Sequence, residues 1–145
     1  MEIKIHRPVM VSAAIIFLAV AVIPSGLISL SGLFFLAFES APAMRRRPLF
    51  IFFGNMLCVL FAILAAARLA NRKENARRMG IMSFAVLGSM SVWNAMAASF
   101  GLTRGHELSI TPFTYLFIFE ALISFSLMTL FLLSHRIRDF LAPHR

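Results

Sequence analysis

Residues 110–133 read ITPFTYLFIFEALISFSLMTLFLL, and this stretch decides the fold. A helix that crosses a bilayer needs about 20 mostly apolar residues, and the stretch is long enough. Its only charged side chain is Glu120. The apolar residues do not alternate with polar ones, as they would in a strand of a transmembrane β-barrel. The stretch therefore predicts a transmembrane α-helix with a carboxyl group near its centre.

Three further apolar stretches precede it, at residues 9–38, 48–67 and 81–100. The first is longer than one span needs, because its length as a helix is about 45 Å and the hydrocarbon core is about 30 Å thick. Pro24 lies inside it, and proline kinks a helix. We expect one long span kinked at Pro24, with a re-entrant segment as the alternative. The whole chain, residues 1–145, predicts a single domain, an all-α integral membrane bundle of four transmembrane helices.

The composition agrees with lipid as the surrounding solvent. Of the 145 residues, 60% are hydrophobic and 14% are charged, whereas a soluble domain has about 45–50% apolar and about 25% charged residues. The net charge of +8 would suggest nucleic-acid binding in a soluble protein. Here the basic residues form short clusters between apolar stretches, which is typical of contact with anionic lipid head groups. We expect the bilayer as a partner, and no nucleic acid.

The basic residues also predict an orientation. With four spans, the N-terminus, residues 68–78 and the C-terminal tail share one side and hold ten Lys and Arg, whereas the two other loops hold four. Basic residues favour the cytoplasmic side. We therefore expect a multi-pass protein of the plasma membrane, the bacterial inner membrane, with both termini in the cytoplasm. The triplet at residues 45–47 opposes this orientation, because it falls on the outer side.

Glu120 is the sharpest candidate for function. A charge at bilayer depth costs about 2.5–3.5 kcal/mol on insertion scales. The carboxyl group can be protonated, face a polar cavity or bond to a partner subunit. Counting residues from the ends of the spans brings several polar side chains to a similar depth. The predicted intramembrane polar cluster comprises Glu120, Asn94, Asn55, Ser91 and Ser124. It is open whether this cluster titrates protons, coordinates a cation, or only joins helices by hydrogen bonds of about 0.6 kcal/mol each.

Small residues recur at helical spacing in the third stretch. They are Gly88, Ser91, Ala95 and Ala98. Small side chains let helices approach closely in lipid, where no hydrophobic drive brings them together. We predict a helix-packing face here, against either another helix of this chain or another protein.

Signatures of catalysis and of bound cofactors are lacking in the sequence. It contains no Gly-rich phosphate loop, no His-Glu-x-x-His zinc motif and no Gly-x-Ser-x-Gly nucleophile turn. The histidines lie at the ends or in loops, where they predict neither haem nor metal ligation. We expect no cofactor, no metal and no catalytic residue, and the sequence does not favour an enzymatic function.

Three functions follow as hypotheses. The first is a non-enzymatic accessory or partner-binding subunit, which associates with another membrane protein or with itself. The second is a small oligomeric transporter that uses the carboxylate of Glu120. The third is a membrane enzyme acting on lipid, for which the loop residues His106 and Glu107 are the candidates. A fold does not by itself select among these functions.

Overall fold

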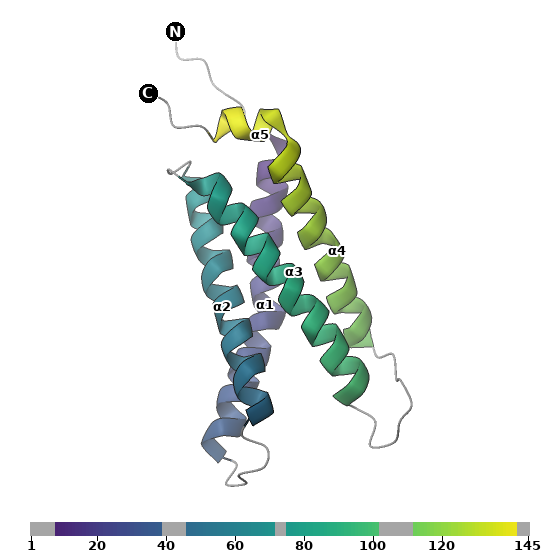
Figure 1. Ribbon diagram of the computed structural model, residues 1–145. Coiled ribbons are helices and arrows are strands. Elements are labelled where there is room, and N and C mark those ends of the chain that lie inside the picture. Colours follow the sequence, from purple (N-terminus) through teal and green to yellow (C-terminus); the bar gives the residue numbers. More distant parts are fainter. Residues whose placement is uncertain (1–7, 39–45, 72–74, 102–111, 142–145) are drawn as a thin grey trace.

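The computed structural model describes residues 8–38, 46–71, 75–101 and 112–141, with side chains at 8–30, 52–71, 75–99 and 112–141. Within these ranges the chain is helical and has no strand (Figure 1). The helices are α1 (Val9–Phe38), α2 (Arg46–Ala70), α3 (Ala76–Gly101), α4 (Pro112–Leu133) and α5 (His135–Phe140). The first four are long and apolar enough to cross a membrane. The prediction of an all-α bundle with four candidate membrane spans is confirmed.

Helix α1 is continuous from Val9 to Phe38 and includes Pro24. One continuous helix agrees with a single span rather than with two re-entrant halves. Proline has no backbone N–H, so Pro24 cannot donate the helical hydrogen bond to the carbonyl of Val20, four residues earlier. The kink at Pro24 stays a prediction.

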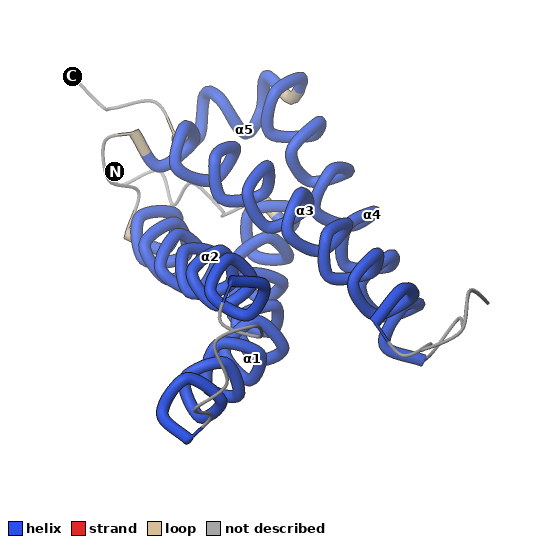
Figure 2. Tube along the Cα trace, turned by 60° about the horizontal axis from the view of Figure 1, so that its bottom comes forward, coloured by secondary structure: helices blue, strands red, loops and turns tan. Residues whose placement is uncertain are grey.

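The spans are arranged as two antiparallel helix pairs, α1–α2 and α3–α4 (Figure 1). The pairs pack on each other mainly through α2 and α3, whereas α1 and α4 barely touch. We call the end where α1 begins and α5 lies the terminal end, and the opposite end, where α4 begins, the loop end. The two pairs lie close together at the terminal end and diverge toward the loop end (Figures 1 and 2).

The apolar core occupies the half of the bundle next to the terminal end. Leu18 of α1, Leu69 of α2, Phe84 of α3 and Phe131 of α4 are all fully buried there. The rings of Phe84 and Phe131 meet edge to face, with their centroids 5.4 Å apart. Aromatic pairs prefer this arrangement. Packing at this end therefore closes the bundle.

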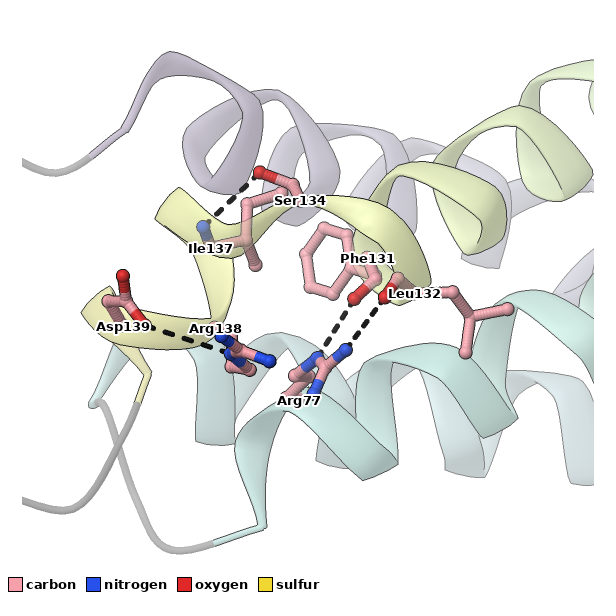
Figure 3. Close-up of polar contacts among 7 residues, drawn as sticks. All are labelled: Arg77, Phe131, Leu132, Ser134, Ile137, Arg138 and Asp139. Atoms are coloured by element: carbon pink, nitrogen blue, oxygen red, sulfur yellow. Dashed lines mark hydrogen bonds and ion pairs between the residues drawn. The ribbon is translucent and has the colours of Figure 1, made fainter.

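The end of α4 is bound to the beginning of α3 through Arg77 (Figure 3). Its Nε donates to the carbonyl of Phe131 and its Nη2 to that of Leu132, both at 2.9 Å. Carbonyls in the last turn of a helix lack helical partners and carry partial negative charge, so a guanidinium group suits them. The sequence predicts Arg77 to lie in a loop, and it gives no sign that Arg77 binds the end of α4.

A short helix, α5, follows α4 and lies across the terminal end (Figure 1). Its first turn is capped by Ser134, whose hydroxyl accepts a hydrogen bond from the backbone N–H of Ile137 at 3.3 Å (Figure 3). Ile137 and Phe140 are buried against the core, whereas Arg136 and Arg138 are exposed. The exposed face also carries Asp139, which forms an ion pair with Arg138 at 3.7 Å (Figure 3). This division between an apolar and a charged face is typical of helices that lie in a membrane interface.

Candidate functional site

Buried polar side chains gather between the middle of the bundle and the loop end. All five residues of the predicted polar cluster are buried. Ser25, Ser29, Ser99 and Thr114 are buried in the same half, and Ser83 is the exception nearer the terminal end. Within the described residues, the buried polar side chains are thus concentrated in the half toward the loop end, and Glu120 lies near the middle of the bundle.

Glu120 on α4 faces α3. The hydroxyl of Ser91 lies near its carboxyl group and donates to the carbonyl of Leu87 at 2.9 Å. Ser124 donates to the backbone carbonyl of Glu120 at 2.8 Å, so its hydroxyl is satisfied within α4. The other carboxyl oxygen, Oε1, is buried and has no hydrogen-bond partner among the residues described. Glu120 therefore keeps an unused acceptor inside the bundle.

Asn94 lies one turn from Ser91 on α3, about 4.5 Å along the helix axis. Its Nδ2 donates to Oδ1 of Asn55 on α2 at 2.9 Å, and Nδ2 of Asn55 donates back to Oδ1 of Asn94 at 3.3 Å. The structure therefore arranges the five predicted cluster residues as two neighbouring groups. One is Glu120 with Ser91 and Ser124, and the other is the amide pair that joins α2 to α3.

The small-residue face of α3 turns toward α4. A Cβ atom added at Gly88 would meet the ring of Phe125 at 3.0 Å, so the two helices are in close contact there. Ser91 contacts the same helix, and Ala95 lines a hollow between α3 and α4. Ala98 is half-buried. The contacts recorded for this face are thus made within the chain.

A groove of about 560 Å³ runs between α1 and α4, and Glu120 lines it. The remaining lining side chains are apolar. The groove extends over residues 17–28 of α1 and 113–123 of α4, which is about 15 Å along each helix. This length is half the thickness of the hydrocarbon core, about 30 Å. The groove therefore covers about half of each of these two spans, from the middle of the bundle toward the loop end.

The mouth of the groove is formed by apolar side chains that point away from the bundle. Val20 and Leu27 on α1 are 57% and 63% exposed, and Phe119 on α4 is 63% exposed. Glu120, by contrast, is 6% exposed. In a membrane such a surface meets acyl chains rather than water. The groove thus places the carboxyl group next to the lipid phase.

Other chemistry finds little support in the part of the chain that the structure describes. No group of three or more His, Cys, Asp and Glu side chains there could hold a metal ion. Cys58 is buried in α2, and its thiol donates to the carbonyl of Val86 at 3.8 Å. His106 and Glu107, the candidates for catalysis on lipid, lie outside the described residues.

Glu120 and the polar residues at a similar depth can be picked out from the sequence, whereas the groove cannot. Its lining residues on α1 and α4 look like any lipid-facing apolar residues, and only the arrangement of helices brings them together. Comparison with protein-family models, with curated proteins and with solved structures finds no match for this chain. Its function is therefore inferred from the geometry of the groove and of Glu120.

Proposed function

We propose that this chain is a small carrier of the bacterial inner membrane, active as an oligomer, in which Glu120 exchanges a proton for a substrate. The observation that carries the proposal is the buried Oε1 of Glu120, which has no partner among the described residues and belongs to a residue that lines the groove. Ionisable residues inside membranes are costly to keep and usually serve a function.

The surroundings of Glu120 suit a carboxyl group that carries a proton when the groove is empty. Ser91 has one hydroxyl hydrogen, and its bond to the carbonyl of Leu87 uses that hydrogen. That hydrogen is then not available to a charged carboxylate of Glu120. A neutral acid also avoids the free energy of an isolated charge in lipid.

The two halves of the bundle differ in a way that suits a carrier. At the terminal end, α5 and the apolar core close the space between the helices. Toward the loop end the helix pairs diverge (Figure 1), and polar side chains such as Ser99 and Thr114 are buried there beside apolar ones. A carrier needs a site near the midplane that opens to one side at a time. Because four helices enclose little space, we propose that two or more copies complete the pathway.

An accessory subunit that binds another membrane protein is the weaker proposal. The small residues that suggested an external partner contact α4 of the same chain. A partner helix in the groove would contact it over only half of a span, about 15 Å. For a lipid-acting enzyme, no described residue supplies the chemistry.

The terminal end is proposed to face the cytoplasm. Arg78, Arg136 and Arg138 are exposed there, and Arg68 lies in the last turn of α2 at the same end. Basic side chains at a membrane surface favour the cytoplasmic side and attract anionic head groups. Anionic lipid is therefore the proposed partner of this end.

Reconstitution into vesicles that contain a pH-sensitive dye tests the carrier function. A cationic, a zwitterionic and an anionic amphiphile are added in turn, and proton movement across the membrane is followed. We expect at least one of them to drive proton movement with the native chain and none with Glu120→Gln. Tyr115→Phe is the matched control, because Tyr115 is an exposed ionisable residue of α4 that does not line the groove. Absence of proton movement with all three solutes, or equal movement with Glu120→Gln, would contradict the proposal.

A further inference from the structure

Aromatic side chains form part of the walls of the groove. Phe17 of α1 and Phe113, Phe117 and Phe119 of α4 line it together with the acid. The face of an aromatic ring attracts a cation, more strongly where water is excluded. An apolar wall also binds an apolar body without loss of hydrogen bonds. The lining therefore favours a ligand that is both positively charged and apolar.

The backbone of α1 adds a second acceptor to the groove. Val20 and Pro24 both line the groove, and Pro24 cannot donate the helical hydrogen bond to the carbonyl of Val20. Because α1 and α4 run antiparallel, Val20 and Glu120 both lie in the part of the groove nearer the middle of the bundle. A ligand that donates hydrogen bonds, or one that carries positive charge, can use both oxygens.

No basic side chain lies at this depth among the described residues of the spans. Arg77 meets α4 at Phe131, about 16 Å along the helix from Glu120. Arg68 and Arg78 belong to the same end of the bundle as Arg77. The other titratable groups in these spans are Arg46 and Arg47 at the loop end of α2, the thiol of Cys58, bonded to a backbone carbonyl, and the exposed Tyr115. The positive charge that would match Glu120 is thus left for a ligand to supply.

The dimensions indicate a single small molecule. A volume of about 560 Å³ falls within the range of about 300–1,000 Å³ that pockets for drug-sized ligands have. The groove spans about half of the hydrocarbon core, so it matches a molecule that resides in one leaflet. Its apolar mouth opens to lipid, which makes the bilayer the source of the ligand.

We infer that this groove binds an amphiphilic monocation, which enters between α1 and α4 from the lipid phase and pairs with the carboxylate of Glu120. This inference rests on the proposed carrier function. As the cation binds, the O–H bond of the carboxyl group breaks and its proton passes to water, with no oxidation or reduction. The site is then neutral in both states, as an acid when empty and as an ion pair when occupied. This exchange avoids an unpaired charge in the membrane.

Two ions of nearly the same shape and opposite charge provide the test. Binding of tetraphenylphosphonium and of tetraphenylborate to the purified full chain in mild detergent is measured by calorimetry, and proton release by an indicator in weak buffer. We expect saturable binding of the phosphonium with release of about one proton per ion, as linkage requires. Tetraphenylborate is expected to bind only as it does to detergent alone.

Two kinds of variant separate charge from shape. Glu120→Gln keeps the size of the side chain, and we expect it to abolish proton release and to weaken phosphonium binding at least about tenfold. Val20→Trp fills the groove, and a similar loss is expected. Ile16→Trp is its control, because Ile16 is an exposed residue of α1, 64% exposed, that does not line the groove. Circular dichroism and gel filtration check that each variant is folded.

Equal binding of the two ions, or undiminished phosphonium binding by folded Glu120→Gln or Val20→Trp, would overturn the inference. If the zwitterion or the anion alone drives Glu120-dependent proton movement in vesicles, the carrier function stands and the cation inference fails. If the phosphonium binds with proton release but no solute moves protons across vesicles, the binding inference stands and the carrier function fails.

Discussion

Asn55 and Asn94 each donate a side-chain hydrogen bond to the other across the interface of α2 and α3. Both amides are buried, 0% and 5% exposed. The interface joins the two helix pairs, which have little contact between α1 and α4. The amide pair therefore fixes the depth at which one helix pair meets the other, next to the level of Glu120.

Replacing these amides one at a time and together measures how strongly they couple. Asn55→Leu or Asn94→Leu alone removes the hydrogen bonds that the remaining buried amide makes across the interface, and we expect each to lower the free energy of unfolding by about 1–2 kcal/mol. The double variant should lose less than the sum of the two, with a coupling of about 1 kcal/mol. Unfolding in mixed micelles provides the measurement, and additive losses would contradict the pairing.

The contact between Arg77 and the end of α4 predicts a specific loss of stability. In Arg77→Ala the carbonyls of Phe131 and Leu132 lose their charged donor, and we expect the unfolding free energy to fall by about 1–2 kcal/mol. Arg78→Ala is the matched control, since Arg78 is exposed one residue further along α3. Equal melting temperatures of the two variants would show that the guanidinium contact contributes nothing.

Gly88 and Gly26 predict opposite responses to the same substitution. A side chain at Gly88 meets the ring of Phe125, whereas nothing lies within 4 Å of a Cβ atom at Gly26. We expect Gly88→Leu to separate α3 from α4 and lower stability by about 1–3 kcal/mol, and Gly26→Leu to be tolerated. Thermal unfolding in detergent compares the two. A tolerated Gly88→Leu would mean that the α3–α4 contact is not close.

The proposed orientation is tested with introduced cysteines. Cys58→Ala gives a chain without cysteine, into which Asn71→Cys or Thr103→Cys is introduced. In intact bacterial cells, a maleimide that cannot cross membranes should label the cysteine at 103 and not that at 71, because basic loops stay in the cytoplasm. Labelling at 71 alone would reverse the orientation.

Most of the fold could be predicted from the sequence because lipid imposes simple rules. A helix must satisfy its own backbone within the membrane, so length and apolar character are enough to identify a span. The structure extends the second and third predicted spans to Arg46–Ala70 and Ala76–Gly101. The polar residues at the ends of these helices still form helical backbone hydrogen bonds. A search for apolar stretches does not include them, so it predicts helices that are too short.

The arrangement of the helices could not be predicted in the same way. Counting depth brought Glu120 level with Ser91, Asn55 and Asn94, but depth does not reveal which helix each side chain faces. Arg77 was predicted to be a charged residue of a loop. Its partners are backbone carbonyls, which every residue has, so the sequence does not identify them. Helix α5 was missed since its apolar side chains, Ile137 and Phe140, are only two among basic residues.

The division into two helix pairs has a consequence for how the chain is assembled. Each pair packs within itself, and the two meet chiefly through one face of α2 and one of α3. Helices that are individually stable in lipid associate after insertion, so the covalent link between the pairs contributes proximity rather than structure. Two fragments, residues 1–73 and 74–145, synthesised separately in one cell should recombine into the native bundle. Variants of the α2–α3 interface could then be selected genetically by whether the fragments associate.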